Sequence, residues 1–232
     1  MEILYEDNHI LVVNKSPGEL VQGDKTGDMP LSERLKELIK IRDNKPGNVF
    51  LGVTHRLDRP VGGVVVFAKT SKALARMNEM FRKGEVHKTY WAIVSGCPEP
   101  AEGELVNHLE SVERINKTFI KPVATPHSKQ AALRYRTLFK GDRYSLVEVK
   151  LLTGRKHQIR VQLAGIDCPI KGDLKYGSKR SNPDGGISLL ARHIEFVHPV
   201  SKKMISITAP VPEGFKFLMP NTECNNHCET NE

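Results

Sequence analysis

Hydrophobic residues recur along parts of this chain at the spacing of a helix. From Pro30 to about Arg42, leucine and isoleucine return at helical intervals with lysine and glutamate between them, which predicts an amphipathic helix that starts near a proline. A second helix is expected after Ser71, which we assign as its cap, and before Gly84, which closes it. A short third helix is expected over Lys156–Leu163.

Short apolar runs between turn residues predict strands. Ile3–Tyr5 and Ile10–Val13 are separated by polar turn residues and predict a strand pair. Val64–Phe67 is β-branched and follows two glycines, which favours a buried strand. The other expected strands are Thr89–Val94, Ala132–Phe139, Tyr144–Leu151, Ile187–Val197 and Met204–Ala209. Many strands with few helices, out of strict alternation, predict an α+β fold with a large mixed or antiparallel sheet flanked by helices and loops.

The chain of 232 residues has room for one substantial core, which can be built as two lobes. We expect one domain over residues 1–217 and an acidic, unstructured tail over residues 218–232. The tail contains Cys224 and Cys228 on either side of a histidine, but no second ligand pair lies nearby in the sequence, so no metal site is expected.

The charge balance of the chain is basic. The sequence has 35 Lys and Arg against 27 Asp and Glu, and three of the acids lie in the tail, so the body carries 35 basic against 24 acidic residues. Such a surface suits a polyanion, although charge alone does not separate RNA binding from simple solubility. Neither a run of about 18 apolar residues nor a signal peptide is visible, so we expect a cytoplasmic protein.

Several short motifs carry the chemistry. His55-Arg56-Leu57-Asp58 places a carboxylate just ahead of the expected strand Val64–Phe67. The other blocks are His87–Gly96, Leu152–Arg160, Pro169–Asp173 and Tyr176-Gly177. In order and spacing these blocks resemble the signature of the RluA-type pseudouridine synthases, over roughly Ile3 to Pro210. The resemblance implies a pseudouridine synthase fold with a central active-site cleft, and an RNA-modifying isomerase.

The resemblance assigns three catalytic residues. It makes Asp58 the nucleophile or base that attacks the uridine, so that the base detaches from the ribose, turns and rejoins through carbon. It makes Arg160 the cation that pairs with Asp58, and a nearby cation lowers the pKa of a carboxylate by about 1–3 units. It makes Tyr90 the aromatic residue that stacks on the target uracil. Without the other blocks, each of these residues would be read as an ordinary structural residue.

The resemblance also implies how the substrate is held. A base inside a stack must be flipped out to reach a carboxylate in a pocket, and the matching arginine in relatives, Arg56 here, fills the vacated place. Further RNA contacts are expected from His55, Arg155, His157, Lys171 and Lys175, although a solvated charged loop explains the two lysines equally well. We expect structured RNA, ribosomal or transfer, as the partner of a monomeric enzyme.

No cofactor is expected. The isomerisation involves no redox change and no group transfer, and the sequence contains neither a phosphate-binding loop nor a dinucleotide-binding loop. His55-Arg56-Leu57-Asp58 faintly resembles a kinase catalytic loop, but the asparagine and the Asp-Phe-Gly motif that a kinase needs are missing.

The chain departs from the family pattern at two places. Val61-Gly62-Gly63 stands where the family has Thr-Ser-Gly, which removes two hydroxyls, and Gln162 stands where histidine is commoner. The chain also starts directly at the catalytic blocks, as do short family members that lack the small basic N-terminal module. Such members act on transfer RNA, ribosomal RNA or both.

Two rival functions remain open at this stage. A catalytically inactive relative could retain the basic surface and act as an RNA-binding or ribosome-assembly factor, although the intact catalytic residues disfavour this. A glycosidase-like hydrolase would need a second carboxylate about 5–10 Å from Asp58. Asp173 could supply it only if the fold brought the two together.

Overall fold

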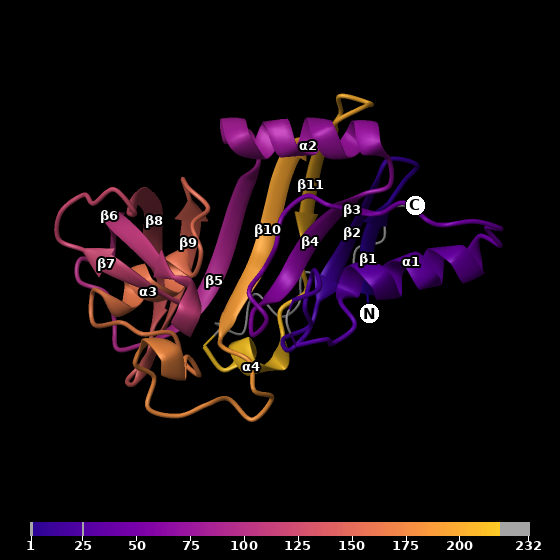
Figure 1. The fold of residues 1–232 in the computed structure, drawn as a ribbon. Helices are drawn as coiled ribbons and strands as arrows, with labels where there is room; N and C mark the ends of the chain where they lie inside the picture. The colour runs from indigo at the N-terminus through magenta and orange to yellow at the C-terminus, as the bar shows by residue number, and fades with distance from the viewer. Residues whose placement is uncertain (1, 25, 219–232) are drawn as a thin grey trace. The chain divides into compact units, whose positions relative to one another are not determined.

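The computed structural model describes residues 2–24 and 26–218, and these form two compact units (Figure 1). The first unit comprises Met1–Thr89, Pro183–Gly186 and Leu190–Pro210. The second comprises Tyr90–Asn182, Ile187–Leu189 and Val211–Glu232. No helix in the described part of the chain is long and apolar enough to cross a membrane.

The sheet of the first unit follows the order β1-β2-β4-β10, and β11 pairs with β10 off this path (Figure 1). The pairs β1–β2, β2–β4 and β10–β11 are antiparallel, whereas β4 and β10 are parallel, and the two-residue strand β3 pairs with β4. The strands are β1 (Glu2–Glu6), β2 (Ile10–Lys15), β3 (Gly52–Val53), β4 (Gly62–Ala68), β10 (Leu189–Val197) and β11 (Met204–Thr208). The two parallel strands start at the same edge, where Gly62 lies opposite Leu190.

Two helices accompany this sheet, α1 (Leu31–Arg42) and α2 (Ser71–Lys83). Met77 and Met80 of α2 pack with one face of β2, β4 and β10 in a buried cluster that includes Val12, Val66 and Phe196. The alternate residues of β2 and β4 point to the other face of the sheet and are also fully buried. Both faces of the sheet are therefore covered, which explains the continuous apolar runs in its sequence.

The second unit contains the strand order β5-β9-β8-β6-β7. These strands are β5 (His87–Ser95), β6 (Glu102–Val112), β7 (Lys117–Lys121), β8 (Lys129–Lys140) and β9 (Tyr144–Leu151). The pairs β6–β7, β6–β8 and β8–β9 are antiparallel. Helix α3 (Gln158–Ala164) contributes Val161 to a small core with Leu109, Ala131 and Tyr176. The unit also contains 3₁₀ turns at Glu113–Ile115 and Leu174–Tyr176 and a short helix, α4 (Glu213–Lys216).

Most expected elements are confirmed, within a few residues at each end. The cap of α2 is Thr70 rather than Ser71, because the Thr70 side chain accepts a hydrogen bond from the amide of Ala73 and Ser71 is already helical. The third helix begins at Gln158, two residues later than expected, because His157 adopts a left-handed backbone with φ of 53°.

Three strands, the two-residue β3 and the longer β6 and β7, were not expected from the sequence. β6 carries glutamate, asparagine and histidine among its apolar residues, and only Leu109 of this strand is buried. An exposed hairpin of this kind lacks the apolar run that marks a buried strand. The expected tail begins at residue 218, but Leu218 is buried, and residues 219–232, with Cys224 and Cys228, lie outside the described residues.

Candidate active site

Asp58 lies in the loop that leads into β4, and its side chain is half-buried. The loop closes on itself, because the amide of Val61 donates to the carbonyl of Asp58 at 3.0 Å. Arg59 then ties the loop to its neighbours. Its Nε donates to the carbonyl of Gly18 at 3.0 Å, and its Nη2 lies 2.7 Å from Asp28. The backbone around the proposed catalytic carboxylate is therefore held on both sides.

Lys15, which the sequence analysis missed, lies beneath this loop and is 1% exposed. Its Nζ donates to the carbonyls of Ser16, Arg59 and Val61 at 2.9, 3.1 and 2.7 Å. The pKa of Lys15 is lowered to about 8, chiefly by burial; the charges of Glu19 and Asp58 partly oppose this shift, and that of Arg59 adds to it. A buried ammonium with three carbonyl acceptors thus organises the Asp58 loop.

The sequence contains a signal for this residue. Leu11, Val13 and Lys15 share one face of β2 because side chains alternate along a strand. A lysine on a face that is otherwise aliphatic is a candidate buried cation. Charged side chains at strand ends are usually exposed, however, so the sequence pattern alone does not distinguish a buried lysine from an exposed one.

Gly62 and Gly63 occupy the first positions of β4, where the family pattern would place serine and glycine after a threonine. Gly63 has φ of +113°, and a Cβ on it would lie 2.3 Å from the carbonyl oxygen of Ala191 on β10. Only glycine fits at this close approach of two parallel strands. These two glycines thus begin strand β4 and do not lie in the turn before it.

The neighbours of Asp58 in the motif differ in their surroundings. Arg56 is exposed, as a residue that inserts into RNA needs to be. His55 accepts a hydrogen bond at Nε2 from the amide of Val66 at 3.0 Å, and its ring lies 4.9 Å from that of Phe81. Burial, and secondarily the charge of Lys88, lower the pKa of His55 to about 3, so the ring is neutral at pH 7. The described contacts of the His55 side chain are with other residues of the protein.

Arg160 projects from α3 and forms a buried ion pair within the second unit. Its Nε and Nη2 donate to the two carboxylate oxygens of Asp173 at 2.6 and 2.9 Å, and the two side chains are 5% and 1% exposed. Both oxygens of Asp173 are therefore engaged, and the residue is shielded from solvent. A glycosidase-type general acid needs access to its substrate, so this arrangement does not fit Asp173 in that role.

The Arg160–Asp173 pair belongs to a wider polar network. The Arg160 guanidinium lies 5.1 Å from the centre of the Tyr176 ring. The Tyr176 hydroxyl lies 2.8 Å from Nδ1 of His157 and accepts a hydrogen bond from the amide of Thr118 at 2.8 Å. Burial raises the pKa of Tyr176, so the hydroxyl keeps its proton at neutral pH. This network holds α3, β7 and the 3₁₀ turn at Leu174–Tyr176 together.

The remaining expected RNA-binding residues also make contacts with the protein. Arg155 donates from Nε to the carbonyl of Gln130 at 3.0 Å, and His157 is 7% exposed. Lys171 donates to the side chain of Asn182, and Lys175 to the carbonyl of Asn116, each at 2.8 Å. A role for these residues in RNA binding stays a prediction.

Gln162, the second departure from the family pattern, is 1% exposed. Its amide nitrogen donates to the carbonyl of Leu105 at 3.1 Å and to the side chain of Asn107 at 2.7 Å. The side chain thus links α3 to β6. Glutamine is accommodated here as a structural residue, away from the described contacts of Arg160.

Tyr90 is buried in β5, with 7% of its surface exposed. It belongs with Arg160 to the second unit, whereas Asp58 belongs to the first. The ion pair between Asp58 and Arg160 that the resemblance implies therefore stays a prediction. Among the described residues no group of three or more His, Cys, Asp or Glu side chains could hold a metal ion.

Comparisons with known proteins identify the family of this chain. The family model described as RNA pseudouridylate synthase matches residues 9–165. The chain is 34% identical to ribosomal large subunit pseudouridine synthase C of Buchnera aphidicola subsp. Baizongia pistaciae over 227 residues, which is 94% of this chain and 70% of the relative. It is 33% identical to an uncharacterized RNA pseudouridine synthase of Zymomonas mobilis, over 93% of this chain and 96% of that protein.

A solved structure shares the fold. Human RNA Pseudouridylate Synthase Domain Containing 4 matches with a TM-score of 0.78 and 26% identity, covering 93% of this chain and 90% of that one. The family match spans more than half of the chain and includes the positions of Asp58, Tyr90 and Arg160. This chain belongs to the RNA pseudouridylate synthase family, whose enzymes isomerise uridine in RNA.

Proposed function

We propose that this enzyme converts uridine to pseudouridine in ribosomal RNA of the large subunit, with transfer RNA as the alternative substrate pool. The name of the Buchnera relative, ribosomal large subunit pseudouridine synthase C, supports the choice of ribosomal RNA. The observation that carries the assignment is the family match over residues 9–165, because it includes the positions of all three proposed catalytic residues.

Asp58 is the catalytic carboxylate in this proposal. It attacks the uridine, the bond between ribose and the uracil nitrogen breaks, the base turns, and a new bond forms between the ribose and uracil carbon 5. The proton on carbon 5 then leaves to solvent, the freed ring nitrogen takes up a proton, and Asp58 is released unchanged, so atoms balance and no oxidant or donor is needed. The hydrogen bonds from Lys15 to the carbonyls of Arg59 and Val61 support this role, because a nucleophile must be held in position.

Arg160 and Tyr90 assist this step. Arg160 is the proposed cationic partner of Asp58, and its bidentate pair with Asp173 uses the Nε and Nη2 edge of the guanidinium. A guanidinium held along one edge presents its remaining nitrogen in a defined direction. Tyr90 stacks on the uracil, and Arg56, which is exposed, fills the place that the flipped nucleotide leaves.

The decisive experiment is tritium release from RNA labelled at uracil carbon 5, with ribosomal and transfer RNA transcripts as separate pools. Wild type is expected to release tritium from one pool, and Asp58→Asn to release none. Asp142→Asn is the matched control, because Asp142 is an exposed loop residue to which no ion pair is assigned. Loss of activity in both variants would refute the assignment of Asp58. Binding of RNA by wild type without release from either pool would favour an RNA-binding factor.

We also propose that the enzyme works as a cytoplasmic monomer without a cofactor. A large asymmetric RNA needs no symmetric protein partner. Activity is therefore expected to persist in buffer with a chelator and without nucleotides, and to scale linearly with enzyme concentration. Loss of activity after chelation would contradict the absence of a metal.

A further inference from the structure

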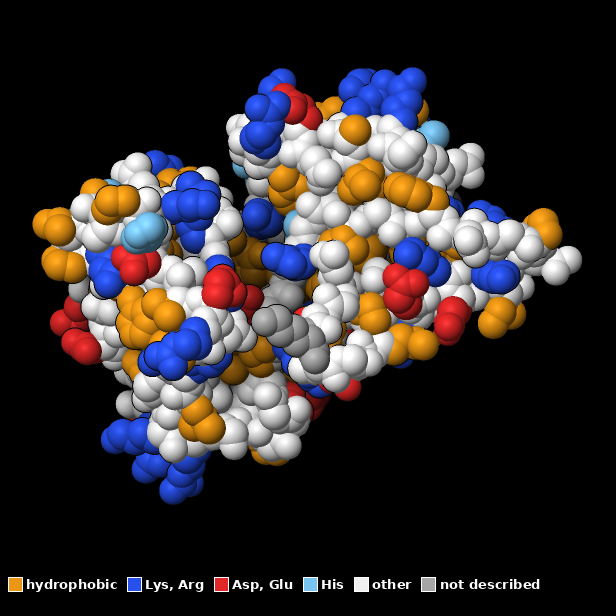
Figure 2. All heavy atoms as spheres, in the orientation of Figure 1, with side chains coloured by type: hydrophobic (Ala, Val, Ile, Leu, Met, Phe, Trp, Pro, Cys, Tyr) orange, Lys and Arg blue, Asp and Glu red, His pale blue; other side chains and the backbone are white. Residues whose placement is uncertain are grey.

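Four basic residues gather at the end of the first unit that is remote from the Asp58 loop. Lys72 and Arg76 lie in the first half of α2, and Lys202 and Lys203 lie in the turn between β10 and β11. Arg76 joins the two segments, because its Nη1 donates to the carbonyl of Pro199 at 2.9 Å. Figure 2 shows Lys and Arg side chains gathered over α2. We call these four residues the α2 basic cluster.

The topology separates this cluster from Asp58. β4 and β10 are parallel, and the Asp58 loop enters β4 at its first residue, Gly62. α2 starts three residues after β4 ends, and the turn with Lys202 follows the end of β10. The seven residues of β4 span about 20 Å at roughly 3.3 Å per residue. The cluster and the proposed catalytic loop therefore lie at opposite ends of the same pair of strands.

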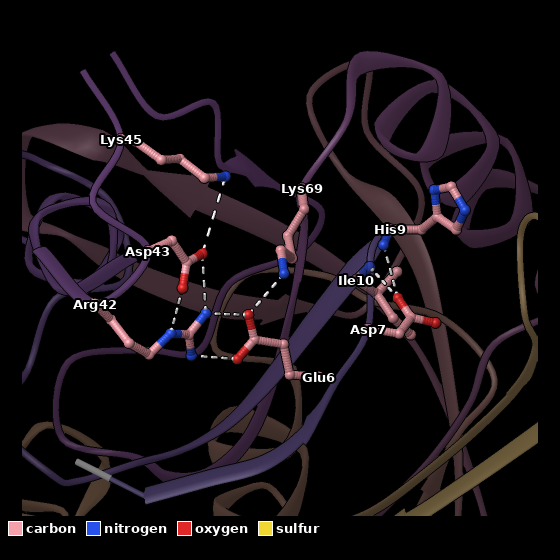
Figure 3. Close-up of polar contacts among 8 residues, drawn as sticks. All are labelled: Glu6, Asp7, His9, Ile10, Arg42, Asp43, Lys45 and Lys69. Carbon is pink, nitrogen blue, oxygen red and sulfur yellow. Dashed lines mark hydrogen bonds and ion pairs between the residues drawn. The ribbon is translucent and has the colours of Figure 1, made fainter. Parts of the chain in front are cut away.

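The cluster lacks acidic partners. No described carboxylate forms an ion pair with any of its four members. Several other exposed basic residues of the unit are paired. Arg42 and Lys69 both bind Glu6, and Asp43 binds Arg42 as well (Figure 3), while Arg82 and Lys83 share Glu79. The cluster thus groups four basic residues without a described carboxylate partner, whereas the basic residues around Glu6 and Glu79 share theirs.

The turn that carries Lys202 and Lys203 is rigidly built around His198, which is 1% exposed. Its Nδ1 accepts from the amides of Val200 and Ser201 at 3.1 and 2.8 Å, and its Nε2 lies 2.9 Å from Asp7. Asp7 is itself engaged by the amides of His9 and Ile10 (Figure 3). Asp7 therefore serves the turn and forms no ion pair with the two lysines.

We propose that the α2 basic cluster is a second docking site, which binds the sugar–phosphate backbone of the RNA substrate at about 20 Å or more from the target uridine. Phosphate groups suit it because the cluster offers unpaired cations on a preorganised backbone and no aromatic or base-reading groups. The inference rests on the proposed function, since a structured RNA is the polyanion that this enzyme must hold. Only an RNA that extends well beyond the modified loop can reach the cluster.

The test compares two substrates, a folded ribosomal RNA domain and a short stem-loop with the same target uridine. The variant is Lys72→Glu/Lys203→Glu, because both residues are exposed, whereas Arg76 holds the turn and Lys202 has φ of +64°. The control is Lys40→Glu/Lys140→Glu, which makes the same charge change at two exposed, unpaired lysines elsewhere.

For the long RNA, the cluster variant is expected to raise KM by about 10- to 100-fold at about 0.1 M salt, with kcat unchanged. The slope of log KM against log salt concentration is expected to fall by about two units. For the stem-loop, variant and wild type are expected to agree. Equal effects on both RNAs, or equal effects of the control variant, would overturn the proposal. If wild type modified neither RNA, the proposed function would fail, and the same comparison by fluorescence anisotropy of RNA binding would still decide the docking site.

Discussion

Replacing Lys15 with methionine tests the buried cation beneath the Asp58 loop. Methionine fills the space of the aliphatic stem but leaves the carbonyls of Ser16, Arg59 and Val61 without their donor. Each carbonyl that stays dry costs about 1–3 kcal/mol. Removing the charge returns about 3 kcal/mol, because burial lowers the pKa of Lys15 from 10.5 to about 8 and each unit is worth about 1.4 kcal/mol. We expect a net loss of stability of about 3 kcal/mol at pH 7, the midpoint of the range of about 0–6 kcal/mol that these contributions leave.

The pH dependence of this loss has a definite sign. Between about pH 8 and 10.5 the unfolded chain still binds the Lys15 proton and the folded chain has released it. The unfolded state then binds more protons, so the wild type gains stability as the pH rises. The variant lacks this gain, and the difference between the two proteins is expected to widen by about 2 kcal/mol from pH 7 to pH 9.5.

Urea unfolding at both pH values measures this difference. The chain contains one tryptophan, Trp91, which is 9% exposed and so reports on unfolding by fluorescence, and circular dichroism provides a second probe. Lys40→Met, at an exposed helical lysine, is the control and is expected to leave the difference flat. A constant or shrinking difference between wild type and Lys15→Met would refute the account of Lys15 as a desolvated cation.

Three further substitutions test other parts of the structure. Hydrogen bonds from Arg42 lower the pKa of Glu6 to about 2, against a smaller opposing effect of burial. Glu6→Gln should therefore cost about 1–3 kcal/mol of stability at pH 7. In urea titrations, the advantage of the wild type should vanish as the pH falls from about 4.5 to 2. Asp173→Asn removes a carboxylate partner from the buried guanidinium of Arg160 and should cost about 3–5 kcal/mol. Part of this loss should be restored in Asp173→Asn/Arg160→Met, and no recovery in the double variant would contradict this. Gly63→Ala should prevent stable folding because its Cβ meets the backbone of β10, whereas Gly185→Ala, with φ of +69° and open space, should cost only about 1–2 kcal/mol in thermal unfolding.

The sequence predicted those elements whose cause is local. The helix over Leu31–Arg42 and the strand Tyr144–Leu151 follow from their own hydrophobic periods, and both were found at or near the expected residues. Where local signals were ambiguous, the prediction shifted or failed. Thr70 and Ser71 are equally good caps by type, and only the backbone decides between them.

The candidate site divides in the same way. The blocks around Asp58, Tyr90 and Arg160 could be recognised because each is a short contiguous string, and such strings identify the family. The contact partners of these residues could not be predicted from such short sequence motifs. Arg160 meets Asp173, which lies 13 residues away, and Arg76 meets a turn more than a hundred residues further along the chain.

The sequence by itself therefore determined the α+β class, most of the strands and the catalytic motif of this enzyme. Only the tertiary structure decided that Lys15 is buried beneath the Asp58 loop, that Asp173 is a partner of Arg160 and that the α2 basic cluster is unpaired. The physical reason is that burial and charge pairing depend on which distant segments the sheet brings together. Hydrophobic period specifies the face of a strand, but not the neighbour that covers that face.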